Sequence, residues 1–353
     1  MGDSSASSKR VKLRDGRFLA YREVGVSKHK AKFKIILVHG FRSSKNMNFS
    51  VSNELIQELG VYLLFYDRSG YGESDSNAKS LKREVDDIEE LADLLEIGPK
   101  FYLIGISLGA YPTWGSLKHI PHRLSGVAFV APTVNYQWPS LPEKLIKKDY
   151  RRIFINLCLM ISEYAPGLLH WRVIQHLIQS TSSVLRSNVL YLNSFHDIKV
   201  LKRPTVTPNV TKNKDVVWFD TIRDDFVACF EQWDFEPADL SISKESSVHI
   251  WHGMKDPVVP FQLLRCILQK QPLINYHEMP HGGHMIAEYD GTGDAILRAL
   301  LLGEEEKIYK PVLDAPFDGN MFHETDLFWG FKRKRFLLLL GFCFFFLCSY
   351  FFN

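Results

Sequence analysis

The sequence predicts an α/β fold in which a mostly parallel central sheet is flanked by helices and interrupted by a helical lid insertion. Several short apolar runs have the length of strands and show no alternation between apolar and polar residues. Such runs are typical of strands buried on both faces, because helices cover both sides of a parallel sheet. The runs are residues 34–38, 61–66, 101–104, 127–130, 248–251 and 273–276.

Helical patterns lie between these runs and complete the alternation that an α/β fold requires. Apolar residues recur at helical spacing from about Ser80 to Ile97, with acidic residues on the opposite face. Near the start of the chain, two alternating stretches flank Asp15-Gly16, which predicts a β-hairpin. In such a fold, ligands bind beyond the carboxyl ends of the parallel strands.

The alternation of strands and helices stops between residues 135 and 239. This stretch has helical apolar segments, such as residues 153–161 and 168–178, and no clear buried-strand run. We interpret it as a lid over the sheet; the alternative is an ordinary helical subdomain with no role in binding. The predicted organisation is a first core part at 10–134, the lid at 135–239, a second core part at 240–305, a polar linker at 306–335 and a C-terminal anchor at 336–352.

Composition excludes several classes of function. The net charge is only +3 with 24% charged residues, which is not the strongly basic balance typical of a nucleic-acid binder. The five cysteines have no metal-ligand spacing and do not suggest a disulfide framework, so they fit a reducing compartment. Gly70 and Gly72 lack the spacing of a phosphate-binding loop. We therefore expect neither a cofactor nor a metal.

A serine on a strand-to-helix turn is the strongest chemical signal in the chain. The run Gly105-Ile106-Ser107-Leu108-Gly109 directly follows the strand predicted at 101–104, and a helix can begin at Ala110. Small residues on either side of the serine let the backbone turn sharply, and the helix N-terminus favours developing negative charge. The context predicts that Ser107 is a nucleophile.

A nucleophilic serine needs a base, and the base needs an acid that orients it. Asp256 follows the strand predicted at 248–251, and His284 follows the one predicted at 273–276, so both should lie at the same sheet edge as Ser107. His281 is the main rival as base; Gly282 and Gly283 favour His284 because they allow a tight approach. The rival acids, which sit in less suitable places, are Asp75, Asp225 and Asp239.

The oxyanion that forms during acyl transfer needs two backbone N–H donors. One is expected from Leu108, the residue after the nucleophile. We assign the second to Phe41, in the loop after the first buried strand, where Gly40 lets the backbone approach closely. The neighbouring His39 is expected to be structural.

The motifs follow one another in a familiar order. They are His39-Gly40, the run Asp67-Arg68-Ser69-Gly70-Tyr71-Gly72-Glu73-Ser74, Gly105-Ile106-Ser107-Leu108-Gly109, Asp256 and Gly283-His284. Over about residues 15–305 they resemble the α/β-hydrolase superfamily, AB hydrolase-1 type, and residues 119–136 resemble a plant branch of it. The resemblance implies an α/β-hydrolase fold and cofactor-free hydrolysis of carboxylic esters or related acyl compounds. Epoxide hydrolases and haloalkane dehalogenases of this superfamily carry an aspartate as nucleophile, so Ser107 argues against both activities.

Three functions are consistent with these residues, and a carboxylesterase or lipase-like enzyme is the favoured one. The second is a ligand receptor of the same fold that keeps the triad and turns over slowly or not at all, and the third is a scaffold protein. The expected partner is a small acyl or ester molecule, and no nucleic acid is expected. Aromatic residues of the lid favour a lipophilic substrate, although they could equally pack among themselves: Phe154, Tyr164, Trp171, Trp218, Phe226 and Trp233.

The C-terminal tail carries a basic cluster, Lys332 to Arg335, followed by the apolar stretch 336–352. About 17 apolar residues is the lower limit for a membrane span. The basic cluster predicts a tail-anchored protein whose hydrolase part faces the cytosol, with a membrane contact through the tail. Two alternatives stay open, a read-through artefact of the gene model and a buried core segment. Without the anchor, a cytoplasmic protein is expected.

Overall fold

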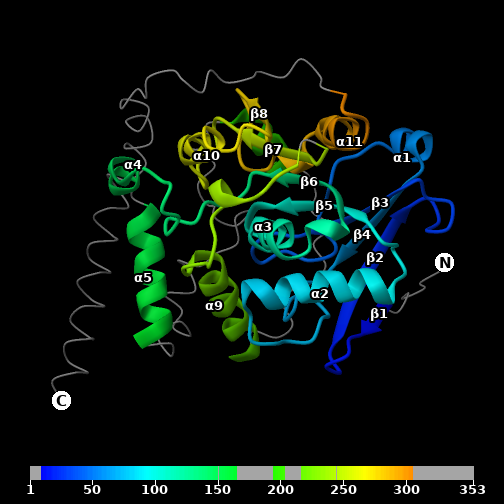
Figure 1. Cartoon of the computed structure of the whole chain (residues 1–353), viewed down its shortest axis with the longest axis horizontal. Coiled ribbons are helices and arrows are strands. Elements are labelled where there is room, and N and C mark those ends of the chain that lie inside the picture. The colour runs from blue at the N-terminus through cyan, green and yellow to red at the C-terminus, as the bar shows by residue number, and fades with distance from the viewer. Residues whose placement is uncertain (1–8, 150, 165–193, 203–215, 244, 305–353) are drawn as a thin grey trace. The chain divides into compact units, whose positions relative to one another are not determined.

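The computed structural model describes residues 9–149, 151–164, 194–202, 216–243 and 245–304 (Figure 1). Its centre is an eight-stranded sheet in the order β1-β2-β4-β3-β5-β6-β7-β8. The strands are β1 (Lys9–Lys12), β2 (Phe18–Gly25), β3 (Phe33–Val38), β4 (Val61–Tyr66), β5 (Phe101–Ile106), β6 (Leu124–Val130), β7 (Ser247–Gly253) and β8 (Asn275–Met279). Strands β1 and β2 pair antiparallel, and all pairs among β3 to β8 are parallel. The mostly parallel sheet and the hairpin at Asp15-Gly16 are thus confirmed.

The position predicted for the last strand was wrong by a few residues. We expected a strand at 273–276, whereas β8 begins at Asn275 and ends at Met279. The strand contains Glu278, which is fully buried and whose carboxylate accepts hydrogen bonds from Arg265 at 2.7 and 2.5 Å. A search for apolar runs cannot detect a strand whose buried positions are filled by a paired charge.

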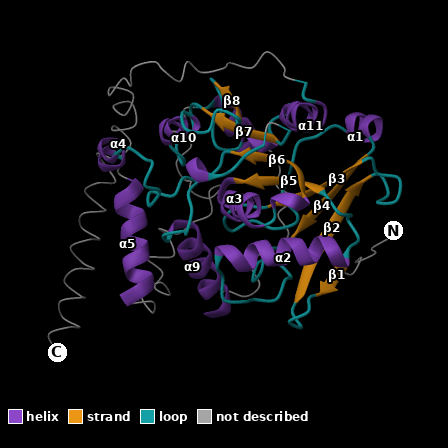
Figure 2. Cartoon of the chain, in the orientation of Figure 1, coloured by secondary structure: helices purple, strands orange, loops and turns teal. Residues whose placement is uncertain are grey.

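One face of the sheet is covered by α1 (Asn53–Leu59) and α11 (Thr292–Leu302), as Figure 2 shows. Helix α1 begins after Ser52, whose hydroxyl accepts a hydrogen bond from the backbone N–H of Leu55, and ends at Gly60 in the left-handed conformation. The apolar residues of both helices pack against every second residue of the central strands in one core cluster. This alternation follows from the two-residue period of a strand.

The opposite face is covered by α2 (Leu81–Leu94) and α3 (Ala110–His119). Ser80 caps α2, and the helix buries the apolar stripe predicted between Ser80 and Ile97. On α3, the ring of Trp114 stacks on Phe129 of β6 with 3.9 Å between centroids. Because α3 starts right after the Ser107 turn, its packing on the sheet fixes the place of that turn.

Between β6 and β7, the described part of the chain contains helices joined by loops and no strand. Its helices are α4 (Glu143–Lys148), α5 (Arg151–Tyr164), α8 (Phe195–Lys202) and α9 (Val216–Phe230), followed by the short helix η5 (Pro237–Asp239); α10 (Phe261–Leu268) comes after β7. The predicted helix at 153–161 lies within α5, and the one at 168–178 falls outside the described residues. The role of this stretch as a lid stays a prediction.

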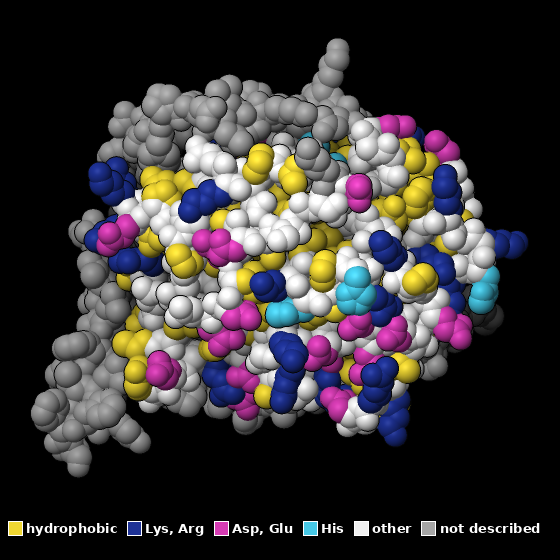
Figure 3. Space-filling view, in the orientation of Figure 1, with side chains coloured by type: hydrophobic (Ala, Val, Ile, Leu, Met, Phe, Trp, Pro, Cys, Tyr) yellow, Lys and Arg dark blue, Asp and Glu magenta, His cyan; other side chains and the backbone are white. Residues whose placement is uncertain are grey.

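Two further expectations concern the surface and the tail. On the face seen in Figure 3, cationic and anionic side chains are interspersed rather than gathered in a basic patch. Within the described ranges, no helix has both the length and the hydropathy that crossing a membrane requires. The predicted linker and anchor, residues 306–335 and 336–352, lie outside those ranges.

Candidate active site

The turn at Ser107 joins β5 to α3 and has the sharp geometry predicted for it. Ser107 has a φ of +53°, in the left-handed region that a residue with a Cβ rarely adopts. Glycine is needed on both sides. An added Cβ would lie 2.2 Å from the side-chain oxygen of Thr113 at Gly105, and 2.3 Å from the backbone oxygen of Val38 at Gly109. The two glycines therefore let the turn pack between α3 and β3.

The structure brings Ser107, His284 and Asp256 together at the carboxyl edge of the sheet. His284 Nε2 lies 2.9 Å from Ser107 Oγ, and His284 Nδ1 lies 2.7 Å from Asp256 Oδ2. All three side chains are buried. The distances give one continuous hydrogen-bonded chain from the carboxylate through the imidazole to the hydroxyl. Such a chain lets the imidazole accept the serine proton while the carboxylate stabilises the resulting charge.

Asp256 is itself held in place by its own loop. Its second oxygen, Oδ1, accepts hydrogen bonds from the backbone N–H groups of Val258 and Val259 at 2.7 and 3.0 Å. The Nε2 atom of the buried His252 lies 3.4 Å from Asp256 Oδ2. The carboxylate therefore has fixed contacts on both oxygens and cannot turn away from His284.

The electrostatics of the pair oppose the effect of burial. Burial would lower the pKa of His284, but the charge of Asp256 and its hydrogen bond outweigh burial and raise that pKa above its usual 6.5. Burial would likewise raise the pKa of Asp256, yet the neighbouring imidazole lowers it below the usual 3.8. The contact between the two side chains therefore keeps Asp256 ionised and makes the His284 imidazole a better proton acceptor.

The loop after β3 lies directly beside Ser107. A Cβ added to Gly40 would be 3.1 Å from the Cβ of Ser107 and 3.6 Å from its Oγ. Phe41 follows Gly40 in this loop, and Leu108 follows Ser107 in the turn, so each predicted oxyanion donor is the next residue after one that lies at the Ser107 turn. His39 is fully buried, and its Nε2 accepts a hydrogen bond from the backbone N–H of Arg68 at 3.0 Å. This contact agrees with the structural role expected for His39.

The rival residues lie elsewhere. His281 is exposed, and Asp239 is exposed at the end of η5. Asp75 accepts a hydrogen bond from the backbone N–H of Phe18 at 2.8 Å and forms an ion pair with Arg10. None of these three side chains has a contact with Ser107 or His284 in the described part of the chain.

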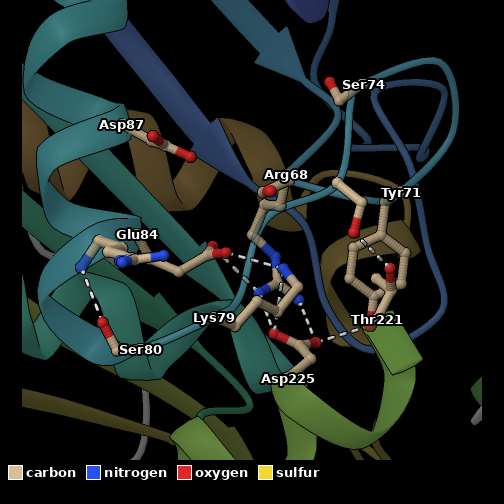
Figure 4. A network of polar contacts seen from close by, with 12 residues as sticks. Arg68, Tyr71, Ser74, Lys79, Ser80, Glu84, Asp87, Thr221 and Asp225 are labelled. Atoms are coloured by element: carbon tan, nitrogen blue, oxygen red, sulfur yellow. Dashed lines mark hydrogen bonds and ion pairs between the residues drawn. The ribbon is translucent and has the colours of Figure 1, made fainter. Parts of the chain in front are cut away.

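The third rival acid, Asp225 on α9, lies in a buried network with Arg68 (Figure 4). The guanidinium of Arg68 donates two hydrogen bonds to the Asp225 carboxylate at 2.5 and 2.7 Å. Tyr71 and Tyr111 donate their hydroxyl protons to the same carboxylate, at 2.6 and 2.8 Å. Arg68 Nε also donates to the backbone oxygen of His39 at 3.1 Å. The network thus connects α9 to the loop that carries Phe41.

Sequence reasoning missed Asp197 on α8. Its carboxylate accepts hydrogen bonds from the backbone N–H groups of His284 and Met285, at 3.0 and 3.1 Å. The only signal was the spacing Ser194-x-x-Asp197, which predicts a helix start and indicates nothing about the loop of His284. The backbone N–H of Asp197 does point at the Ser194 hydroxyl, at 3.4 Å.

Two further features bear on ligands. Among the described residues, no group of His, Cys, Asp and Glu side chains is arranged to hold a metal ion. Of the aromatic residues named at 135–239, Trp233 packs against Trp138 and Phe235 with 5.5 Å between ring centroids, and Phe226 packs against Phe230 at 4.7 Å. Trp171 lies outside the described residues, so the choice between a lipophilic site and internal packing stays open.

Solved structures with the same fold include several hydrolases. The epoxide hydrolase CorEH has a TM-score of 0.56 at 16% identity, over 83% of this chain and 97% of that chain. An esterase from Exiguobacterium antarcticum has a TM-score of 0.53 at 15% identity, covering 78% and 92%. A bromoperoxidase from Bacillus anthracis has a TM-score of 0.52 at 16% identity, covering 82% and 96%. At such identities the likeness establishes the fold alone.

The strand order and these likenesses define an α/β-hydrolase fold. The sequence model of the alpha/beta hydrolase family matches residues 35–296, from β3 into α11. The chain therefore belongs to the α/β-hydrolase family. A search of curated protein sequences gives no significant match.

Proposed function

We propose that this protein is a serine hydrolase that cleaves carboxylic esters or related acyl bonds through an acyl-enzyme on Ser107. The observation that carries the proposal is the hydrogen-bonded chain from Asp256 through His284 to Ser107, with contacts of 2.7 and 2.9 Å. A serine in a strained turn, in contact with a base that an acid orients, is the arrangement that activates a hydroxyl for acyl transfer.

In the proposed reaction, His284 Nε2 takes the proton of Ser107 as Oγ attacks the acyl carbon. The resulting oxyanion accepts hydrogen bonds from the backbone N–H groups of Phe41 and Leu108. The imidazolium then returns its proton to the leaving alcohol, and the acyl-enzyme remains. A water molecule, deprotonated by His284, releases the acid and restores the Ser107 hydroxyl.

Ser107 also distinguishes this proposal from epoxide hydrolysis, since epoxide hydrolases of this superfamily carry an aspartate as nucleophile. The epoxide hydrolase and the bromoperoxidase share the fold with this chain and carry no argument about its substrate. We keep a small lipophilic ester as the proposed substrate class. A series of p-nitrophenyl esters of increasing acyl length tests this part, and a kcat/KM that falls steadily from acetate to decanoate would contradict it.

The direct test of the reaction compares the wild-type protein with Ser107→Ala on p-nitrophenyl acetate. We expect the wild type to hydrolyse the ester and to gain the mass of an acetyl group on Ser107 in rapidly quenched samples. Ser107→Ala should lose both properties while keeping its fold. Ser241→Ala, at an exposed serine before β7, is the matched control and should behave as the wild type. Hydrolysis retained by Ser107→Ala would overturn the proposal.

If the folded wild type hydrolyses no ester, the alternative function is favoured. That alternative is a receptor of the same fold that binds its ligand without rapid turnover.

A further inference from the structure

A buried cluster of three side chains, from two segments of the chain, makes hydrogen bonds to the loop that carries His284. These are Ser194 and Asp197, at the start of α8, and Tyr289, after the loop. Each is at least nine-tenths buried. None of them lies in the first loop residues after a strand of the sheet, where the nucleophile, base and acid were predicted.

Asp197 makes the central contacts of this cluster. Its Oδ2 accepts the backbone N–H of His284 at 3.0 Å, and its Oδ1 accepts that of Met285 at 3.1 Å. The Tyr289 hydroxyl donates the third hydrogen bond to this carboxylate, also at Oδ1. A carboxylate that receives several donors in a buried place is rigidly held, because each oxygen would lose its partners on rotation.

The remaining contacts extend this hold to the residues just before His284. The Tyr289 hydroxyl accepts the backbone N–H of Gly283 at 2.9 Å, and the Ser194 hydroxyl lies 2.9 Å from the backbone oxygen of His281. A Cβ added to Gly283 would lie 2.0 Å from Asp197 Oδ2. Gly283 is therefore required because the Asp197 carboxylate lies directly against the loop.

We propose that Asp197 is a positioning residue that holds the backbone of His284 so that its imidazole lies between Asp256 and Ser107. The proposal rests on the function proposed for Ser107. It assigns to the inserted helical stretch an indirect part in the reaction, since α8 supplies the carboxylate that holds the base. The base is then fixed at two points, through its ring by Asp256 and through its backbone by Asp197.

The second carboxylate also acts on the charge of the base. Burial would lower the pKa of His284, and the charge of Asp197 adds to that of Asp256 in raising it. Removing the charge of Asp197 should therefore lower the pKa of His284, although the ring contact with Asp256 remains. Among the described residues, the ionisable side chains in contact with His284 or the Asp197 carboxylate are Asp256 and Tyr289. His252 contacts Asp256 at 3.4 Å, and the Ser107 hydroxyl contacts the His284 ring.

The test is Asp197→Asn in the full chain, with kcat and KM for p-nitrophenyl acetate measured across pH. The amide keeps one acceptor oxygen but turns its NH2 group towards one of the two backbone N–H donors. We expect kcat to fall by about 10- to 100-fold with KM nearly unchanged, since a displaced base affects the reacting geometry. The acid side of the pH profile should also move to lower pH. Asp290→Asn, at an exposed carboxylate beside α8, is the matched control and should change neither.

A folded Asp197→Asn protein with the wild-type kcat and the wild-type pH profile would overturn the proposal. A lower kcat with an unmoved pH profile would also contradict it. That result is expected of a purely structural role, which does not change the pKa of His284. If Asp197→Asn fails to fold, Tyr289→Phe decides. It keeps the charge but loses the hydroxyl that holds both Asp197 and Gly283, so kcat should fall, and an unchanged kcat would refute the proposed role.

One measurement separates this proposal from the function on which it rests. The pKa of the His284 imidazole can be followed by NMR without any substrate, with His284→Gln used to assign the signal. A wild type without hydrolase activity whose His284 pKa still falls in Asp197→Asn would refute the proposed function and keep the role of Asp197. An active wild type whose His284 pKa is unchanged in Asp197→Asn would keep the proposed function and refute the role of Asp197.

Discussion

His284 Nε2 lies 2.9 Å from Ser107 Oγ, although the two residues are 177 positions apart in the sequence. The contact is possible because β5 and β8 are parallel strands of one sheet, so the loops after them open at the same edge. Neither strand touches the other, since β6 and β7 lie between them. The turn that places His284 packs closely against its surroundings, since Gly283 lies against the Asp197 carboxylate that holds the backbone of His284.

Removing the charge of Asp256 should impair the base without unfolding the protein. Asp256→Asn keeps the shape of the side chain but presents its amide or its carbonyl to His284 Nδ1, and it no longer stabilises the imidazolium. We expect kcat for p-nitrophenyl acetate to fall about 10⁴-fold, as for the equivalent change in serine proteases. Asp239→Asn, at an exposed rival acid, should leave kcat unchanged. If the two variants were equally active, Asp256 would not be the orienting acid.

The pH dependence of the reaction follows from the raised pKa of His284. The imidazole must be neutral to accept the Ser107 proton, so activity is present above its pKa and is lost as the pH falls through it. Because that pKa is raised above 6.5, the acid side of the kcat/KM profile should have its midpoint above pH 6.5. A profile of initial rates from pH 5 to 9 checks this, and a midpoint below pH 6 would contradict the assignment of the base.

The turn at Ser107 should not tolerate a methyl group at Gly109. A Cβ there would lie 2.3 Å from the backbone oxygen of Val38 and 2.8 Å from that of His39, and backbone atoms of a central strand cannot move aside easily. We expect Gly109→Ala to lower the free energy of unfolding by about 3 kcal/mol. Ala110→Gly, at the next position, should cost about 1 to 2 kcal/mol, through helix propensity and the loss of one buried methyl group. Urea unfolding of both variants provides the comparison, and equal losses would contradict the steric argument.

The buried network around Asp225 should stabilise the attachment of α9 to the core. Asp225→Asn leaves the guanidinium of Arg68 without its main counter-charge in a place that water does not reach. We expect a loss of about 3 to 5 kcal/mol in the free energy of unfolding. Asp224→Asn, at a partly exposed neighbour paired with Arg223, should cost less than about 1 kcal/mol. Similar losses in the two variants would show that the network contributes nothing specific.

Much of the fold could be predicted because parallel strands buried on both faces leave continuous apolar runs. The same criterion placed β8 too early, since its buried positions hold His277 and Glu278 instead of aliphatic residues. The boundary between strand and loop at this point depends on the ion pair of Glu278 with Arg265. Such a pair is visible only when α10 and β8 are side by side in space.

The residues of the candidate site also divide into those whose place the sequence predicts and those whose contacts need the folded structure. Ser107, Asp256 and His284 each follow a predicted strand, so their common location follows from the topology of the sheet. Asp197 lies 87 positions before His284 and acts on its backbone, which leaves no pattern in the sequence. Asp225 was considered as an acid from its residue type alone, and its contact with Arg68 needed the placement of α9.

Labelling with a fluorophosphonate tests whether Ser107 is an activated nucleophile. The reagent reacts with a serine hydroxyl only where a base and an oxyanion site assist it. We predict that the wild-type chain is labelled on the peptide that contains Ser107, that Ser107→Ala is not labelled, and that Asp256→Asn is labelled far more slowly. A folded wild type that stays unlabelled, or a Ser107→Ala variant labelled as fast as the wild type, would show that Ser107 is not an activated nucleophile.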